Sequence, residues 1–367
     1  MSTAALFKPF SLKSLSLPNR IVMAPMTRSF SPGGIPGDDV AAYYKRRAEN
    51  QVGLILTEGT APPHPAALND PNVPNFHGTA ALDGWGKVLA AVHAAGGKIM
   101  PQLWHVGIMR RLGSLPDPDV KPVAPSGFSK PGKPIVEPMS EREIADVIAA
   151  YATAACDARR LGFDGIEIHA AHGYLIDQFF WAATNIRADR FGGSAVQRTT
   201  FAADIVKACR AATAPDFPIL LRFSQWKQQD YAAKLAPTAA ELEAFLRPLV
   251  DAGVDIFHCS TRRFWEPEFD GSPMNLAGWT KKLTGKSVIT VGSVGLGVDF
   301  ISGFGSKDAI DTSGNLDKLS EMMERDNIDL AAVGRALITE PAWVVKVREG
   351  RAADIARYDA AALKMLV

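Results

Sequence analysis

The chain has 367 residues, of which 47% are apolar and 22% are charged, and its formal net charge is +1. This composition supports a large buried core and excludes the clustered basic surface that binds nucleic acid or a membrane. The three cysteines, Cys156, Cys209 and Cys259, form no Cys-x-x-Cys pair, so no zinc or iron–sulfur motif is present.

The N-terminal residues show no long apolar stretch behind a basic start, and no run of about 18 apolar residues occurs in the chain. We therefore expect a soluble, cytoplasmic protein. Short apolar runs rich in β-branched residues alternate with amphipathic helical segments, which is typical of repeated β–α units. The predicted strands cover residues 20–23, 53–57, 98–103, 165–169, 218–223, 255–259, 287–291 and 329–333. Eight such units predict an α/β fold, a (β/α)8 TIM barrel, with residues 1–367 as one domain.

The clearest helix is predicted to begin at Ser140, because Ser140-Glu141-Arg142-Glu143 matches a capping box, and to run to residue 161. Within it Cys156, like Cys209 further on, is expected to be a small buried residue of an Ala-rich helix. Further helices are predicted over residues 196–212, 238–252 and 316–325.

Three segments lie outside the repeat. Residues 1–19 are expected to form a hairpin or lid over the N-terminal mouth of the barrel. The Pro- and Gly-rich residues 107–138 are too many for an ordinary connection, so we expect an extended loop over the active site after the third strand. The Gly-rich residues 292–314 similarly extend the loop after the seventh strand.

Chemistry in such barrels lies at the C-terminal ends of the strands, so polar residues where an apolar strand stops are informative. The residues at these positions are Thr27, Gln102, Trp104, His169 and Arg222. A buried arginine is costly unless it meets an anion or a good acceptor. Arg222 therefore faces a ligand or forms a structural ion pair with Glu58 or Glu167, and both interpretations stay open here.

Glycines follow the seventh and eighth strands, in Val291-Gly292-Ser293 and in Val333-Gly334-Arg335. The loops after these two strands form the usual phosphate site of a barrel. Glycine lets the backbone approach a phosphate closely, and Arg335 can add a charge-assisted contact. Together the two turns indicate a phosphate-binding site.

Several stretches, taken in order, resemble the old yellow enzyme family of FMN-dependent ene-reductases over nearly the whole chain. Thr27 stands where one branch of that family has cysteine, so the sequence resembles the threonine-bearing branch. The matching stretches are NRIVMAPMTR (19–28), TEGT (57–60), QLWHVG (102–107), EIHAAHGYLIDQF (167–179), NIR (185–187), RFGG (190–193) and VGR (333–335).

The resemblance implies an FMN site. Thr27 would hydrogen-bond the flavin carbonyl next to N5, Gln102 would pair with the pyrimidine edge, and Arg222 would lie near N1 and O2, where charge tunes the cofactor. Backbone groups near the first strand would lie along the ring, and the two glycine turns would hold the phosphate. The implied cofactor-binding residues are Pro25, Met26, Thr27, Gly59, Gln102, Arg222, Gly292, Ser293, Gly334 and Arg335.

The resemblance also implies a mechanism in which NADPH or NADH reduces FMN and leaves, and an unsaturated carbonyl or nitro compound takes its place. His169 and His172 would donate hydrogen bonds to the substrate oxygen, where negative charge develops. Tyr174 would then protonate the α-carbon, and Trp104 would shape the pocket. The implied partners are small molecules, with the protein a monomer or a homodimer.

Other functions remain to be weighed. His169 and His172 could bind a metal with Glu167 as third ligand, which would suit a flavin-free hydrolase or lyase on the same barrel. They could also be locally satisfied loop residues. Within the family, the same site could reduce nitroaromatic compounds or nitrate esters. A larger relative with an iron–sulfur cluster is rejected, because no cysteine cluster follows the barrel pattern.

The sequence departs from the family pattern in two loops near the expected site. Ile108-Met109-Arg110-Arg111 follows Gly107 where the family often has an arginine directly, and the segment from Arg222 to Lys227 replaces a shorter pattern. Gln225, Trp226 and the aromatic, basic residues 262–265 therefore have no assigned role, and substrate preference is open.

Overall fold

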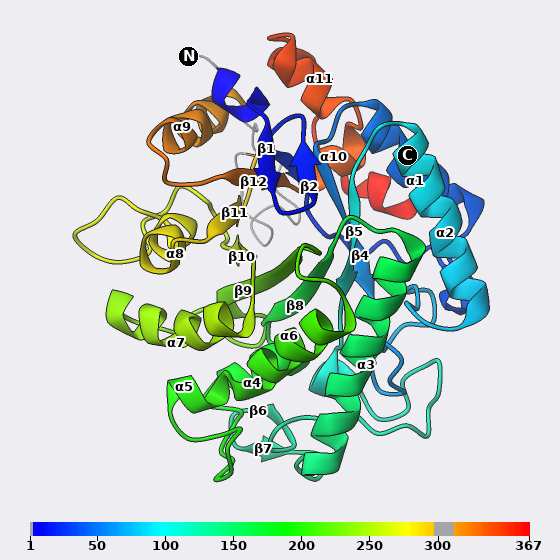
Figure 1. Ribbon diagram of the computed structural model, residues 1–367, viewed down its shortest axis with the longest axis vertical. Helices are drawn as coiled ribbons and strands as arrows, with labels where there is room; N and C mark the ends of the chain where they lie inside the picture. The colour runs from blue at the N-terminus through cyan, green and yellow to red at the C-terminus, as the bar shows by residue number, and fades with distance from the viewer. Residues whose placement is uncertain (1–2, 297–311) are drawn as a thin grey trace.

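The computed structural model describes residues 3–296 and 312–367. Eight parallel strands follow one another around a closed barrel in chain order, which confirms the predicted (β/α)8 architecture (Figure 1). Each strand overlaps its predicted range, and β4, β8 and β9 extend three or four residues beyond it. The barrel strands are β3 (Ile21–Met23), β4 (Leu54–Thr60), β5 (Ile99–Leu103), β8 (Ile166–His172), β9 (Ile219–Lys227), β10 (Ile256–Ser260), β11 (Ser287–Val291) and β12 (Leu330–Val333).

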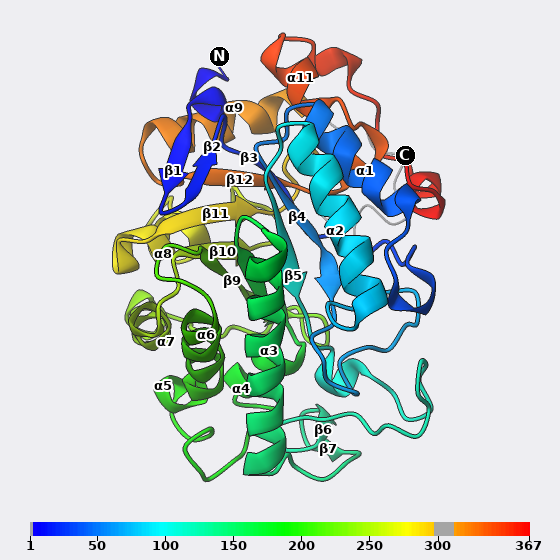
Figure 2. The ribbon, with the colours of Figure 1, turned by 45° about the vertical axis from the view of Figure 1, so that its right-hand side comes forward.

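Helices cover the outside of the barrel, with α2 and α3 running beside β4 and β5 (Figure 2). No helix of the described residues combines the length and the apolar character needed to cross a bilayer. The helices are α1 (Asp38–Glu49), α2 (Thr79–Ala94), α3 (Glu141–Leu161), α4 (Leu175–Phe180), α5 (Ala195–Arg198), α6 (Thr200–Ala212), α7 (Ala239–Ala252), α8 (Leu276–Thr284), α9 (Thr312–Glu324), α10 (Arg335–Thr339) and α11 (Trp343–Arg348).

The capping box predicted at the start of α3 is present. The Glu143 N–H donates to Ser140 Oγ at 3.3 Å, and the Ser140 N–H donates to Glu143 Oε2 at 2.7 Å. The helix buries one face on the barrel, as an amphipathic helix does. Cys156 lies on the opposite face and is exposed, so its predicted burial is wrong, whereas Cys209 is buried as expected.

The helix predicted over residues 196–212 is two helices, α5 and α6. A second capping box at Ser194 begins α5 one residue earlier than predicted. At Thr199 both the backbone N–H (3.1 Å) and the hydroxyl (2.6 Å) donate to the Val196 carbonyl. This tight local bonding competes with the regular helix ladder and divides the segment.

A hairpin closes the N-terminal mouth of the barrel, as predicted for residues 1–19. Its antiparallel strands are β1 (Phe10–Leu12) and β2 (Leu15–Leu17). Phe10, Leu15 and Leu17 pack in one buried cluster with side chains of the barrel interior, including Leu54 and Met100. Apolar side chains therefore fill the N-terminal end of the barrel interior, which leaves the C-terminal end for a site.

The long segment 107–138 does not line the cavity at the C-terminal end of the barrel, although its residue Met109 packs with Trp104 and Tyr174 beside that cavity. It carries a small hairpin, β6 (Phe128–Lys130) and β7 (Lys133–Pro134), beside the first turns of α3 (Figure 2). It is tied to the turn after α4, because the Ile186 N–H donates to Ser126 Oγ at 3.0 Å and Arg187 Nη1 donates to the Pro125 carbonyl at 2.7 Å. Of the second predicted extension, residues 292–314, positions 297–311 lie outside the described residues.

Candidate active site

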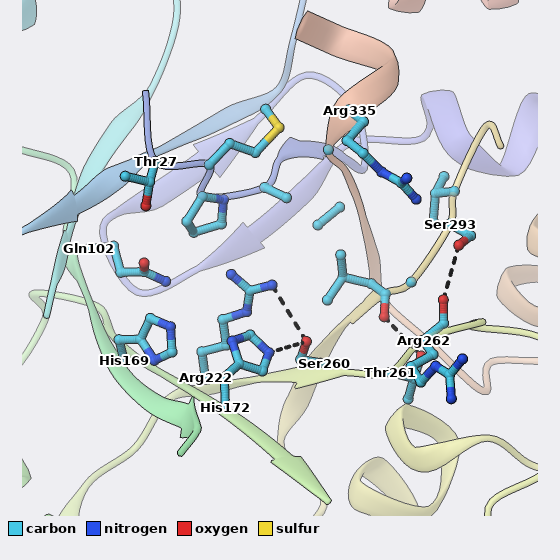
Figure 3. Close-up of a pocket in the computed structure, with 18 of the residues that line it drawn as sticks. Thr27, Gln102, His169, His172, Arg222, Ser260, Thr261, Arg262, Ser293 and Arg335 are labelled. Atoms are coloured by element: carbon cyan, nitrogen blue, oxygen red, sulfur yellow. Dashed lines mark hydrogen bonds between the residues drawn. The ribbon is translucent and has the colours of Figure 1, made fainter. Parts of the chain in front are cut away.

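A cavity of about 430 Å³ opens at the C-terminal ends of the strands. Its wall is formed by residues that end or follow seven of the barrel strands, as Figure 3 shows for part of it. Every site residue predicted from the sequence lines it except Gly59. Those present are Pro25, Met26, Thr27, Gln102, Trp104, His169, His172, Tyr174, Arg222, Gly292, Ser293, Gly334 and Arg335.

Gly59 lies behind Trp104 and not in the wall of the cavity. It pairs with Gln102 across β4 and β5, and a Cβ atom at this position would lie 2.6 Å from Trp104 Cε3. Glycine is therefore required here by the close approach of the indole ring. The structure gives Gly59 a part in seating Trp104, and its backbone contact with a flavin ring stays a prediction.

Replacing Gly59 with alanine is expected to lower the free energy of unfolding by about 1–3 kcal/mol, the usual cost of overpacking a rigid site. Gly86→Ala is the matched control, because Gly86 lies within α2 and no atom comes within 4 Å of an added Cβ. The free energy of unfolding of Gly86→Ala should rise by about 0.5–1 kcal/mol, since alanine is more stable than glycine in a helix interior. Denaturant unfolding measures both, and equal stability of Gly59→Ala and the wild type would contradict this role.

A buried carboxylate fixes the orientation of Gln102. Glu167 Oε1 accepts from Gln102 Nε2 at 2.7 Å, and Glu167 Oε2 accepts from His258 Nδ1 at 2.6 Å. An ionised carboxylate only accepts hydrogen bonds, so the amide nitrogen of Gln102 faces Glu167 and its oxygen is left to accept from a ligand.

The same bonds argue against a metal site. Both Glu167 oxygens are already used by Gln102 and His258. No group of three or more His, Cys, Asp or Glu side chains that could hold a metal ion occurs among residues 3–296 and 312–367. The third ligand that the metal hypothesis needs at His169 and His172 is therefore absent from the described part of the chain.

Arg222, in β9, is buried and lies in the middle of the cavity (Figure 3). Neither carboxylate considered from the sequence pairs with it, since Glu58 Oε2 accepts the backbone N–H groups of Arg28 (2.9 Å) and Ser29 (3.1 Å). Among the described residues Arg222 has no ion pair, and its Nε atom has no hydrogen-bond partner. Burial lowers its pKa, but an arginine stays charged at neutral pH. No direct ion pair therefore joins Arg222 to Glu58 or Glu167 among the described residues, although the charge of Glu167 opposes the effect of burial on the pKa of Arg222.

His169 presents a single N–H group to the cavity. The Ala171 N–H donates to His169 Nδ1 at 3.3 Å, so Nδ1 is unprotonated and the ring proton is on Nε2. Burial and the charge of Arg222 hold the pKa of His169 well below its usual value. The ring is therefore a neutral hydrogen-bond donor near neutral pH.

His172 and Tyr174 lie on a sharp turn at the end of β8. His172 has a φ of 65°, a backbone conformation that costs a non-glycine residue energy and recurs at functional sites. The Tyr174 ring stands edge-to-face on Trp104 at 4.9 Å and on His169 at 5.1 Å. Tyr174 Oη accepts from Gln228 Nε2 at 3.2 Å, and burial raises the pKa of the phenol.

A buried ion pair that sequence reasoning missed supports this turn. Lys227 Nζ lies 2.5 Å from Asp177 Oδ1, with both side chains fully buried, and Asp177 Oδ2 accepts the Gly173 N–H at 2.7 Å. Lys227 reaches Asp177 because β8 and β9 continue beyond their predicted ends, with a bulge between Ala170 and His172. A lysine beyond an apolar run has the signature of a surface residue, so the sequence held no sign of the pair.

The two glycine turns lie together on the other side of the cavity, beside Arg262 and Arg335 (Figure 3). Gly292 has a φ of 149°, and a Cβ there would lie 2.6 Å from the Thr261 carbonyl oxygen. Ser293 Oγ donates to the Arg262 carbonyl at 3.0 Å. The positive charge and the close backbone at this end match the requirements of a phosphate.

A C-terminal segment, unanticipated from the sequence, completes the wall with Tyr358 and Leu363. Arg28 Nη2 donates to the carbonyls of Ala362 (3.0 Å) and Met365 (2.7 Å), which ties the segment to the residue after Thr27. Such contacts join positions more than 330 residues apart and leave no local pattern in the sequence.

Comparison with known proteins agrees with this geometry. The family model described as NADH:flavin oxidoreductase / NADH oxidase matches residues 5–354. The chain is 39% identical over 227 residues to 12-oxophytodienoate reductase 7 of Oryza sativa subsp. japonica, covering 58% of this chain and 57% of the relative. It is 32% identical over 361 residues to an NADH oxidase of Thermoanaerobacter brockii, covering 95% of this chain and 52% of the relative.

The chain thus spans about half the length of these two relatives. Its fold also matches the solved structure of the old yellow enzyme homologue from Zymomonas mobilis, with a TM-score of 0.79, 25% identity, and coverage of 98% of this chain and 96% of that one. The chain therefore belongs to the NADH:flavin oxidoreductase / NADH oxidase family, whose cofactor is FMN, and its predicted relation to the old yellow enzymes is confirmed.

Proposed function

We propose that this protein binds FMN in the described cavity and reduces activated carbon–carbon double bonds of unsaturated carbonyl or nitro compounds with electrons from NADPH or NADH. The observation that carries the proposal is Arg222, a buried cation with no ion pair, between the oriented amide of Gln102 and the cluster of His169, His172 and Tyr174. A buried charge needs a partner, and a ligand in the cavity is the one that the site can accept.

The residues present fit FMN along its length. Arg222 and the free oxygen of Gln102 suit the polar edge of the flavin ring, and Thr27 supplies a hydroxyl nearby. The turns at Gly292 and Gly334 suit the phosphate, with positive charge from Arg335. When bound, FMN would supply the hydride-transfer chemistry between the nicotinamide donor and the alkene.

The chain itself then has two tasks, of which the first is to hold the carbonyl or nitro oxygen of the substrate. His169 offers a neutral Nε2–H at a site where the ring is fixed by its Nδ1 bond to the Ala171 N–H. Negative charge develops on this oxygen as the alkene is reduced, so a preorganised donor binds the transition state more strongly than the substrate.

The second task is to deliver a proton to the α-carbon. Tyr174 holds that proton on Oη, and burial raises its pKa, so the phenol stays protonated near neutral pH. The Gln228 amide donates to the same oxygen at 3.2 Å and stabilises the phenolate that remains once the proton has left.

Replacing His169 with alanine is expected to weaken the binding of phenolic ligands to the FMN-loaded protein by roughly tenfold or more, as a lost hydrogen bond to a charged oxygen costs about 1.5–3 kcal/mol. The measurement is titration with p-hydroxybenzaldehyde, followed by the long-wavelength charge-transfer band. The pKa of His169 is held below the ordinary histidine value of about 6.5, so the ring stays neutral as the pH drops to that value. Protonation of His169 should therefore not change the phenol affinity of the wild type over this range.

The matched control is His93→Ala, because His93 lies on α2 and pairs with Asp164 outside the cavity. It should bind the phenol as the wild type does. Undiminished binding by His169→Ala would remove His169 from the oxygen site.

A further inference from the structure

Ser260, the last residue of β10, lies between Arg222 and His172 in the wall of the cavity (Figure 3). Its Oγ atom lies 2.8 Å from His172 Nε2 and 3.5 Å from Arg222 Nη2. The side chain is buried, so water does not replace these partners freely. A single hydroxyl therefore joins the buried cation to the ring of the second histidine.

The chemistry of the three groups sets the direction of the bond from Arg222 and favours one direction for the bond to His172. Arg222 can only donate, so Ser260 Oγ accepts on that side. The hydroxyl proton of Ser260 then has His172 Nε2 as its acceptor, and no other acceptor for it is recorded among the described residues. Burial, followed by the charge of Arg222, holds the pKa of His172 well below its usual value, so the ring is neutral. A neutral ring that accepts at Nε2 carries its proton on Nδ1.

We propose that Ser260 is a positioning residue that fixes the tautomer of His172, so that the ring offers an Nδ1–H group to a ligand in the cavity. His172 Nδ1 has no hydrogen-bond partner among the described residues, which leaves it to the ligand. His169, by contrast, offers Nε2–H, because its Nδ1 accepts from the Ala171 backbone. The two histidines thus become donors through opposite nitrogens. This inference depends on the proposed function only for the identity of the ligand.

Other contacts hold the plane of the His172 ring, so the hydroxyl of Ser260 has a separate effect. Trp226 stacks on the ring at 4.6 Å, and Tyr231 stacks on Trp226 at 5.6 Å. The backbone N–H of His172 donates to Ser224 Oγ at 3.0 Å. None of these contacts distinguishes one ring nitrogen from the other. Loss of the Ser260 hydroxyl should therefore leave the ring in place and allow both neutral tautomers of His172 to be populated.

The test is nitrogen NMR of the FMN-loaded protein with 15N-labelled histidine, in which protonated and unprotonated ring nitrogens have well-separated shifts. The His172 signals are assigned as those missing from His172→Asn. The wild type should show Nδ1 protonated and Nε2 unprotonated. Ser260→Ala should give a mixture of tautomers, and Ser260→Thr, which keeps the hydroxyl, should restore the wild-type pattern. Protonated Nε2 in the wild type, or an unchanged pattern in Ser260→Ala, would overturn the proposal.

Phenol titration separates this proposal from the proposed function. Ser260→Ala should bind p-hydroxybenzaldehyde roughly two- to tenfold more weakly, because only the fraction of the protein with Nδ1 protonated is competent to bind, and Ser260→Thr should recover most of the affinity. Phenol affinity unchanged by Ser260→Ala would contradict the donor role of His172. If the wild type shows the expected tautomer but binds no phenol, the proposed function fails while the role of Ser260 on His172 stands.

Discussion

Tyr174→Phe is expected to slow the reduction of 2-cyclohexenone by roughly 100- to 10,000-fold while the reduction of bound FMN by NADPH stays nearly unchanged. The phenol is the proposed proton donor on the turn after β8, and phenylalanine keeps its edge-to-face contacts with Trp104 and His169. Loss of activity would therefore reflect the missing proton and not a collapsed cavity. Stopped-flow absorbance measures the two half-reactions separately.

The pH dependence of the same step gives a second check. Only the protonated phenol can donate, so the rate falls as the pH rises through the pKa of Tyr174 in the folded protein. Burial raises that pKa above its ordinary value of about 10. The enone half-reaction should consequently show no loss from this group up to about pH 10, with the decline only beyond it.

Tyr151→Phe is the matched control, because Tyr151 is buried on α3 against the outside of the barrel and does not line the cavity. It should leave both half-reactions as they are in the wild type. Normal enone reduction by Tyr174→Phe would contradict the assignment of Tyr174 as proton donor.

Arg222→Met is expected to weaken FMN binding by about 10- to 100-fold, while the flavin-free protein keeps or gains thermal stability. A charge-assisted hydrogen bond to a ligand contributes about 1.5–3 kcal/mol, and this contribution is lost with the guanidinium. In the flavin-free protein the same guanidinium is a buried charge without an ion pair, and replacing such a charge with an apolar side chain is often neutral or stabilising. The two effects of one substitution therefore have opposite signs.

Quenching of flavin fluorescence on titration gives the affinity, and thermal unfolding with and without FMN gives the stability. Arg160→Met is the control for loss of a positive charge, since Arg160 lies exposed on α3 and pairs with Asp157. It should change neither quantity appreciably. The contradicting result is that Arg222→Met loses as much stability relative to the wild type without FMN as it loses with FMN. That result would show that Arg222 has a structural role, and the argument for a ligand beside it would fail.

The barrel could be predicted from the sequence because its strands are short apolar runs between amphipathic helices, and because the capping box at Ser140 marks a helix start by local chemistry. The ends of β8 and β9 could not be predicted. Their extensions carry polar residues such as His172 and Lys227, which are buried only because each meets a partner on a neighbouring element. The position of residues 107–138 likewise depends on distant contacts, among them those of Arg187.

Polar residues at strand ends make up most of the site, and Ser260, at the end of β10, meets the same criterion. The family pattern predicts a flavin contact for Gly59, and the structure adds that this glycine makes room for Trp104. Asp177 could not be found in this way, because its partner Lys227 is 50 residues distant.

The central claim is tested most directly by the visible absorption spectrum of the purified protein, followed by anaerobic addition of NADPH and then of 2-cyclohexenone. We expect a yellow protein that bleaches with NADPH and recovers its colour with the enone. A protein that stays colourless after incubation with FMN would contradict the flavin site. A yellow protein that bleaches but does not recover with the enone would contradict reduction of activated double bonds.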